Sequence, residues 1–303
     1  MGIMIKYFAL SALLFLVLPT IAQSQQKNEQ IKVDGITRQF VTYIPSVKDT
    51  GYKIPILISL HGRLGTGQRM MAFADFRPIA EKEKFIVVCP DGIDRSWNDG
   101  RPTPAQKKGI NDVKFIDELI TYIIKTYHGD SNRVYVIGMS NGGFMTSRLA
   151  CDLNNKIAAV AIVAASMDKD VNYQPTHPMP VMYIQGTSDP LVPFEGGAMK
   201  GAGGEIYSHK EIIQKWVAVN GCDTTPVITN LPDNARDGTT VIKEAYNGQK
   251  GLPMVISYTV VDGGHIWPGG SQYLPKFIIG KNSNNLNACK VIWEFFKEFK
   301  LTN

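Results

Sequence analysis

Short apolar segments alternate with helical segments along most of this chain, and this alternation restricts the fold more than any other feature. The strand-like segments, rich in β-branched and apolar residues, are 39–44, 54–60, 85–89, 133–137, 157–164, 181–184 and 255–261. The helical segments are 68–82, 111–127, 141–153, 209–219 and 286–299. Apolar strands separated by helices are typical of a parallel sheet that helices cover on both sides. The sequence therefore predicts an α/β fold, in which ligands bind beyond the carboxyl ends of the strands.

The composition favours a globular chain with a buried core. Of the 303 residues, 44 % are hydrophobic and 19 % are charged, a balance that argues against disorder. The net charge of +5 comes without a block of Lys and Arg, so nothing indicates nucleic-acid binding. The chain has no internal repeat and no Pro/Ser linker. We therefore expect residues 23–303 to form a single domain.

The first 22 residues have the pattern of a secretory signal peptide. Lys6 supplies a positive charge, residues 7–18 are mostly apolar, and residues 20–22 offer small side chains for cleavage. The apolar run is short for a membrane span, and we expect no stable membrane insertion. The pattern predicts a secreted or periplasmic protein. An uncleaved N-terminal anchor is the alternative.

Four cysteines could pair if the protein is exported, and they are Cys89, Cys151, Cys222 and Cys289. Four cysteines allow three complete pairings, and the sequence does not choose among them. No Cys-x-x-Cys motif or His/Cys cluster has the spacing of metal ligands. The sequence thus predicts no metal site, and nothing in it indicates a cofactor.

Ser140 lies in the segment Gly-Met-Ser-Asn-Gly at positions 138–142, between a strand-like and a helical segment. In this context G-x-S-x-G predicts a tight turn that exposes a nucleophilic serine, and glycines supply the small neighbours that the turn needs. The first N–H groups of the following helix would point into the same space. An ordinary glycine-rich turn is the alternative.

A serine hydroxyl becomes a good nucleophile when a base removes its proton. His265 is the candidate base, because it stands in a glycine-flanked loop that follows a strand and lies well after Ser140. The order Ser, Asp or Glu, His is expected along such a chain. Asp189 follows the strand-like segment 181–184 and is the candidate acid. Its competitors are Asp168, the strongest of them, Asp170 and Glu195. Structural or surface roles are expected for the other histidines: His61, His128, His177 and His209.

Two backbone N–H groups are candidates for an oxyanion hole, which stabilises negative charge on the carbonyl oxygen under attack. One belongs to Asn141, directly after the candidate nucleophile, and the other to Arg63, in the turn after the segment 54–60. Trp97 and Trp267 are candidate substrate-binding residues, since a few aromatic groups commonly orient a ligand. Packing in the core is the alternative for both tryptophans.

Motifs spread over nearly the whole mature chain resemble the secreted esterases that include polyhydroxybutyrate depolymerases and feruloyl esterases (carbohydrate esterase family 1 and its relatives). The matching segments are 60–62, 90–92, 96–99, 111–113, 138–143, 186–190, 220–222 and 264–270. The resemblance implies an α/β-hydrolase fold with a mostly parallel sheet, helices on both faces and no large lid. It also gives Ser140, Asp189 and His265 the roles of a catalytic triad. The segment Arg-Leu-Gly at 63–65 departs from the family, which is richer in glycine there.

The resemblance implies a secreted serine ester hydrolase that acts through an acyl-enzyme, with feruloyl or related esters of plant polysaccharide as substrates. The substrate could therefore be polymeric. Four alternatives remain open at this point: a polyhydroxyalkanoate depolymerase, a general short-chain carboxylesterase, a serine peptidase, and an inactive hydrolase fold used for binding.

Overall fold

The structure is a computed structural model that describes residues 23–47, 51–171, 174–199, 204–248 and 251–302. The predicted signal peptide, residues 1–22, lies outside the described residues, so it stays a prediction. Among the residues that are described, no helix is long and apolar enough to cross a membrane.

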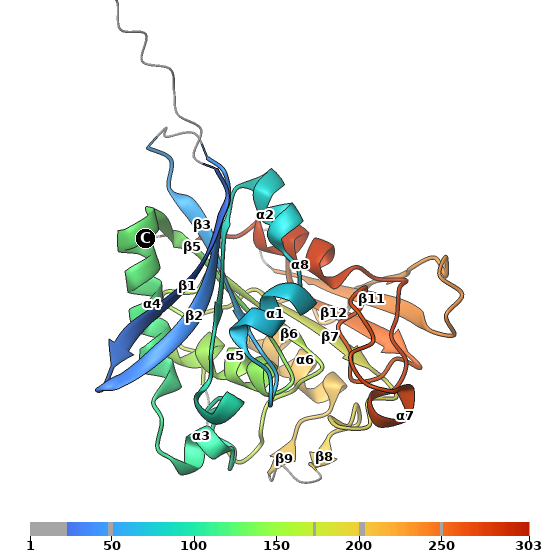
Figure 1. The fold of residues 1–303 in the computed structure, drawn as a ribbon. Helices are drawn as coiled ribbons and strands as arrows, with labels where there is room; N and C mark the ends of the chain where they lie inside the picture. Colours follow the sequence, from blue (N-terminus) through green and yellow to red (C-terminus); the bar gives the residue numbers. More distant parts are fainter. Residues whose placement is uncertain (1–22, 48–50, 172–173, 200–203, 249–250, 303) are drawn as a thin grey trace, which may run out of the picture.

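A central sheet organises the described chain, and its ten strands run in the order β1-β2-β4-β3-β5-β6-β7-β12-β11-β10 (Figure 1). The strands are β1 (Gln25–Val33), β2 (Ile36–Ile44), β3 (Ile54–Leu60), β4 (Ile86–Pro90), β5 (Gly129–Met139), β6 (Ala159–Val163), β7 (Val181–Gly186), β10 (Val227–Asn230), β11 (Thr240–Asn247) and β12 (Pro253–Val261). A separate hairpin consists of β8 (Gly197–Ala198) and β9 (Glu205–Ile206). The six central strands from β4 to β12 are parallel, whereas the strands at both edges pair antiparallel. The mostly parallel sheet predicted from the sequence is confirmed.

Helices cover both faces of this sheet, as expected. They are α1 (Gly67–Phe73), α2 (Arg77–Glu83), α3 (Pro104–Lys107), α4 (Asp112–Tyr127), α5 (Asn141–Asp152), α6 (His209–Val219), α7 (Lys276–Ile279) and α8 (Ala288–Phe296), with a 3₁₀ turn at Ile93–Arg95. The single helix predicted over residues 68–82 is wrong, because the chain forms two helices there. Pro78 lies in the first turn of α2, a position that needs no backbone N–H, and it would break a continuous helix.

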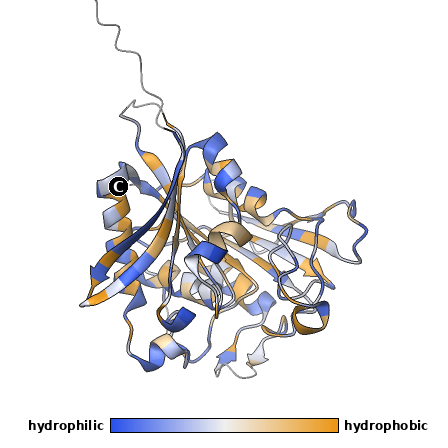
Figure 2. Ribbon diagram, in the orientation of Figure 1, coloured by the Kyte–Doolittle hydropathy of each residue, from blue (hydrophilic) through white to orange (hydrophobic). Residues whose placement is uncertain are grey.

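The core consists of two apolar layers, one on each face of the sheet. Successive residues of β5 alternate between them, so that Val134 faces one layer and Tyr135 the other. Helices α4, α5 and α6 close the first layer with side chains such as Trp216, and α1, α2 and α8 close the second with side chains such as Trp293. Figure 2 shows the apolar residues concentrated in the central strands and in the inner faces of the helices. All seven residues of β3 are buried.

Strand register brings the loops that carry chemistry to one edge of the sheet. Leu60 at the end of β3 pairs with Gly138 of β5, two residues before Ser140. Gly186 at the end of β7 pairs with Val260 of β12. The segments that follow β3, β5, β7 and β12 therefore meet at the carboxyl edge, where α/β proteins bind ligands.

Candidate active site

Ser140 occupies a strained turn between β5 and α5. Its φ of 55° and ψ of −125° lie in a region that residues other than glycine rarely adopt. A Cβ atom on Gly138 would lie 2.2 Å from the carbonyl oxygen of Gly142, and a Cβ on Gly142 would lie 2.3 Å from that of Leu60. The Ser140 N–H donates to the Val163 carbonyl at 3.0 Å, which ties the turn to β6. The two glycines of the motif are thus needed because backbone packs against backbone on both sides of the serine.

His265 and Asp189 form a buried pair at the same edge. His265 Nδ1 lies 2.8 Å from Asp189 Oδ2, while Asp189 Oδ1 accepts hydrogen bonds from the N–H groups of Leu191 and Val192, both at 2.8 Å. An ionised carboxylate only accepts hydrogen bonds, so the proton of a neutral imidazole sits on Nδ1. This leaves Nε2 as the atom able to accept a proton.

The structure thus brings Asp189 and His265 into direct contact and places Ser140 at the carboxyl end of a strand in the same sheet. Within the described part of the chain, no hydrogen bond joins Ser140 Oγ to His265. Catalytic hydrogen bonds are often long until the substrate is bound. The arrangement has the parts needed for nucleophilic attack with base assistance.

The competing carboxylates lie elsewhere. Asp168 is buried, and it accepts a hydrogen bond from the Asp170 N–H at 2.8 Å. A Cβ on Gly204 would lie 2.0 Å from Asp168 Oδ2, so this carboxylate faces the β8–β9 hairpin. Burial raises the pKa of Asp168. Asp170 and Glu195 are exposed. Of these carboxylates, only Asp189 bonds a histidine in the described structure.

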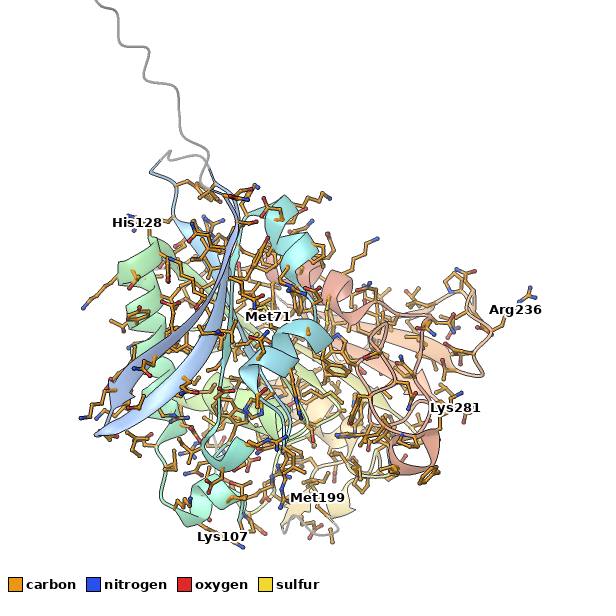
Figure 3. The ribbon with its side chains drawn as sticks, viewed as in Figure 1. Met71, Lys107, His128, Met199, Arg236 and Lys281 are labelled. Atoms are coloured by element: carbon orange, nitrogen blue, oxygen red, sulfur yellow. The ribbon has the colours of Figure 1, made fainter. Side chains whose placement is uncertain are left out.

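His61 has a structural role, as expected from the sequence. Its Nδ1 donates to the Gly62 carbonyl at 2.7 Å, and its Nε2 accepts from the Gly92 N–H at 2.9 Å. Because a backbone N–H can only donate, the ring must be neutral here, and burial lowers its pKa. His128 and His177 are exposed. Figure 3 shows His128 at the surface of the molecule, far from Met199.

His209 is fully enclosed behind the Asp189 turn, a placement that the sequence did not reveal. Its Nδ1 lies 3.1 Å from Gln185 Oε1, and its Nε2 lies 2.7 Å from Ser257 Oγ. Gln185 Nε2 in turn donates to the carbonyl of Val192, whose N–H holds Asp189. Burial lowers the pKa of His209 to about 4. The ring is therefore neutral near pH 7 and supports the turn that carries the acid.

The two predicted oxyanion donors lie in segments next to the nucleophile. A Cβ on Gly62, directly before Arg63, would lie 3.3 Å from Ser140 Cβ, so the loop after β3 passes beside the serine. Asn141 begins α5 and contributes an N–H from the first turn of the helix. Neither the Arg63 nor the Asn141 N–H donates to another group in the described residues. Both remain available to a ligand.

The predicted substrate contact of Trp97 is wrong. Its side chain has 0 % exposed surface, and its indole N–H donates to the His61 carbonyl at 2.9 Å. Trp267 is 2 % exposed, and its ring meets that of Phe73 edge-on. It borders a cavity of about 370 Å³ whose lining includes none of the three proposed triad residues. Trp267 thus lines a cavity that the proposed triad residues do not border, and its contact with a substrate stays a prediction.

The pairing of the four cysteines and the presence of metal-binding side chains can also be examined in the structure. All four cysteines are unpaired in the structure, so none of the three possible pairings forms there. A cluster of three or more His, Cys, Asp or Glu side chains able to hold a metal ion is not found among the described residues.

No protein-family model matches the chain, but individual proteins of known name are similar to it. The chain is 27 % identical over 288 residues to NocK of Nocardia uniformis subsp. tsuyamanensis, a protein named provisionally as an esterase, and the match covers 91 % of this chain and 83 % of NocK. It is 26 % identical over 275 residues to feruloyl esterase B of Piromyces equi, covering 87 % of this chain and 46 % of that enzyme. The chain is a carboxylic ester hydrolase, and its sequence is similar to those of feruloyl esterases.

The fold of this esterase is the α/β-hydrolase fold, as predicted. The structure of the acetyl xylan esterase from Aspergillus awamori superposes on it with a TM-score of 0.56 at 17 % sequence identity. The superposition covers 79 % of this chain and 94 % of that enzyme. The esterase spans most of the length of NocK but about half of the Piromyces enzyme.

Proposed function

We propose that this esterase is a serine hydrolase in which Ser140 is the nucleophile, His265 the base and Asp189 the acid. Ser140 Oγ attacks the ester carbonyl carbon and gives its proton to His265 Nε2. The tetrahedral intermediate collapses, the alcohol leaves with the proton from His265, and Ser140 keeps the acyl group. Water then attacks the acyl-enzyme with His265 again as base, which releases the acid and restores the serine.

The observation that carries this proposal is the hydrogen bond from His265 Nδ1 to Asp189 Oδ2, formed at the sheet edge where Ser140 occupies its strained turn. The N–H groups of Arg63 and Asn141 are the proposed donors to the carbonyl oxygen as it gains negative charge. None of these steps involves a metal, so activity should survive EDTA.

The proposed substrates are feruloyl or related esters of plant polysaccharide. The name of feruloyl esterase B from Piromyces equi supports this proposal, because the match to that relative covers 87 % of this chain. A substrate panel tests it: methyl ferulate, acetylated xylan, hydroxybutyrate oligomers and a p-nitrophenyl ester, compared by kcat/KM. We expect the highest value on methyl ferulate among the natural-type esters. A preference for acetylated xylan or hydroxybutyrate oligomers would contradict it.

A polyhydroxyalkanoate depolymerase is the second candidate, and exposed apolar residues beside the base favour it. Phe277 is 87 % exposed, and Leu274 is 42 % exposed. Both lie in the segment anchored to the base loop, where the His265 N–H donates to Ile279 and the Tyr273 hydroxyl donates to the His265 carbonyl. Such a surface could meet an apolar polymer. Phe277→Ser should then slow hydrolysis of a polyester film while sparing a soluble p-nitrophenyl ester.

Export is part of the proposal, supported by the charge and apolar run of residues 1–22. The secreted or periplasmic protein should begin shortly after Ala22. N-terminal sequencing of the exported protein tests this, and an intact Met1 on a membrane-bound pool would contradict it.

A further inference from the structure

A buried loop between β4 and α3 holds side chains that serve no role in the triad. The loop carries the sequence Ser-Trp-Asn-Asp at 96–99, followed closely by Arg101. Asp99 is 2 % exposed and Arg101 4 % exposed, yet both are charged. Burying such an ion pair costs solvation free energy, so it calls for an explanation beyond stability.

The Asp99 carboxylate joins Arg101 to the residue that follows the nucleophile. Its Oδ1 accepts hydrogen bonds from Arg101 Nε at 3.2 Å and from the Arg101 N–H at 3.0 Å. Its Oδ2 accepts from Arg101 Nη2 and, at 2.7 Å, from Asn141 Nδ2. The side chain of Asn141 thus ends on a carboxylate that a guanidinium holds in a fixed orientation.

The remaining hydrogen-bonding groups of the Asn141 side chain are also used, and all of them point to the same loop. Asn141 Oδ1 accepts from the Trp97 N–H at 2.8 Å, and Asn141 Nδ2 also donates to the Trp97 carbonyl at 3.1 Å. Both amide hydrogens and the amide oxygen therefore have partners. The first residue of α5 is clamped by its side chain, while its backbone N–H stays unpaired beside Ser140.

The same loop also reaches the second oxyanion donor. Trp97 Nε1 donates to the carbonyl of His61 at 2.9 Å, and His61 precedes Gly62 and Arg63 by one and two residues. One buried loop therefore contacts the segments that carry both proposed donors: it binds the Asn141 side chain and the carbonyl of His61, two residues before Arg63.

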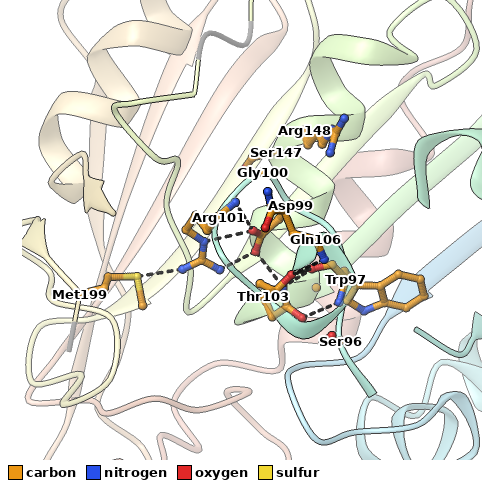
Figure 4. Close-up of polar contacts among 12 residues, drawn as sticks. Ser96, Trp97, Asp99, Gly100, Arg101, Thr103, Gln106, Ser147, Arg148 and Met199 are labelled. Atoms are coloured by element: carbon orange, nitrogen blue, oxygen red, sulfur yellow. Dashed lines mark hydrogen bonds and ion pairs between the residues drawn. The ribbon is translucent and has the colours of Figure 1, made fainter. Parts of the chain in front are cut away.

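Arg101 anchors this arrangement to two further elements. Its Cζ lies 3.4 Å from the ring centre of Phe144, which is on α5, and its Nη1 donates to Met199 Sδ at 2.9 Å. Figure 4 shows Arg101 between Asp99 and Met199. The guanidinium is thus fixed by the nucleophile helix on one side and by the start of the β8–β9 hairpin connection on the other.

We propose that Asp99 and Arg101 are positioning residues that set the Asn141 N–H of the oxyanion hole. The inference rests on the proposed function, because it requires an oxyanion beside Ser140. A carboxylate at position 99 orients the Asn141 amide, and the guanidinium orients the carboxylate. Neither group touches the substrate, so their loss should weaken binding of the transition state more than binding of the ground-state ester.

The test is a double-mutant cycle on Asp99→Asn and Asn141→Ala, assayed on p-nitrophenyl acetate. Asn141→Ala keeps the backbone N–H of residue 141 and removes only the side-chain amide that bonds to Asp99 and Trp97. Each single variant should lower kcat about 10- to 100-fold with KM within about threefold, since loss of a whole oxyanion donor costs about 100- to 1,000-fold. The double variant should lose no more than about threefold beyond the worse single one, because Asp99 acts through Asn141.

A trifluoromethyl ketone supplies a second readout, since its adduct with the serine places an oxyanion in the same site. Its inhibition constant should rise in each variant by the factor by which kcat/KM falls. Asp130→Asn is the matched control. It breaks the ion pair in which Arg133 Nε lies 2.6 Å from Asp130 Oδ2, at the opposite end of β5. This variant should leave kcat/KM and the inhibition constant unchanged.

A kcat for Asp99→Asn within twofold of the wild type would overturn the positioning role, and so would losses that multiply in the double variant. If Asp99→Asn does not fold, Arg101→Lys takes its place in the cycle under the same criteria, since it keeps the charge and loses the planar fork. Failure of the proposed function gives a different result: the wild type itself would not be labelled at Ser140 by a fluorophosphonate.

Discussion

The two halves of the active site are built in different ways. In the acid–base half, after β7 and β12, two side chains meet directly, with His265 Nδ1 2.8 Å from Asp189 Oδ2. In the oxyanion half, after β3 and β5, the proposed donors are backbone N–H groups of Arg63 and Asn141. A third loop bonds the Asn141 side chain and the His61 carbonyl through Asp99 and Trp97. Side-chain chemistry defines the first half, and loop geometry defines the second.

This difference determines how strongly a side-chain substitution should lower activity in each half. Changing Asp189 or His265 alters a group that handles the proton, so the effect should be large. Only proline removes a backbone N–H, and it also constrains the backbone, so the oxyanion half is better probed through the side chains that support it. The largest effect is expected at the Ser140 oxygen, because both halves act on it.

Ser140→Ala should have the largest effect, because both halves act on the Ser140 oxygen. We expect kcat to fall on the order of 10⁵- to 10⁶-fold, as for loss of a triad nucleophile. The fold should persist, as measured by circular dichroism. Substantial turnover by a folded Ser140→Ala protein would mean that neither half serves this residue.

Asp189→Asn tests the acid–base half. The amide keeps the size of the side chain, removes the negative charge and favours the wrong His265 tautomer, so kcat should fall by about a thousandfold or more with a much smaller change in KM. Asp168→Asn is the control, because its carboxylate faces the β8–β9 hairpin. Steady-state kinetics of both variants on one soluble ester decide the matter. If kcat fell strongly in Asp168→Asn and stayed at the wild-type value in Asp189→Asn, the acid would be Asp168 and not Asp189.

Trp97→Phe tests the oxyanion half through the hydrogen bond from the Trp97 indole to the His61 carbonyl. Phenylalanine fills most of the same space but lacks the indole N–H, so the buried His61 carbonyl loses its partner. We expect kcat to fall about tenfold, below the cost of losing an oxyanion donor outright. KM should change little, and a pre-steady-state burst experiment should place the loss in the acylation step. An increase in KM with normal kcat would instead return Trp97 to substrate binding.

The smallest effect on turnover is expected at His209, whose titration should instead appear as a pH dependence of stability in the acid–base half. Its pKa in the folded protein is about 4, below the value of about 6.5 for a free histidine, so the unfolded chain binds more protons between these values. The free energy of unfolding should therefore contain the full contribution of His209 above pH 6.5. It should fall as the pH drops towards 4, by up to about 3 kcal/mol. Urea unfolding across this range measures the fall. The slope should be reduced in His209→Gln, and an unchanged slope would show that other groups cause it.

The sequence placed Ser140 in a tight turn between a strand and a helix, and Asp189 and His265 in loops after strands, as the structure has them, while their catalytic roles stay proposals. Motif glycines, strand ends and chain order all pointed to Ser140, Asp189 and His265, since these side chains must follow particular strands in this fold. The fold was predicted on the same grounds, because apolar strands and helical periodicity are local properties. The segment 39–44 predicted most of the antiparallel strand β2, but β1, β10 and β11 were missed. The residues of β10 are all exposed and carry no apolar alternation.

The supports of the oxyanion half could not be derived from periodicity or spacing. Asp99 and Asn141 are 42 positions apart, and their contact depends on how the loop after β4 folds over α5. The motif at 96–99 marked the loop as one that resembles the family, but it did not show that Trp97 turns inward. A tryptophan near a proposed site fits substrate contact and core packing equally well until its exposure is known.

The most direct test of the account is the location of the acyl group during turnover. The esterase is mixed with a p-nitrophenyl ester, quenched in acid within the first turnover and digested for peptide mass spectrometry. In the wild type, the added acyl mass should appear on the peptide that contains Ser140. In Ser140→Ala this mass should be absent. In Asp189→Asn it should accumulate further only if deacylation becomes the slow step. Acyl mass on a different residue, or turnover without any acylated peptide when deacylation is slowed, would contradict the account.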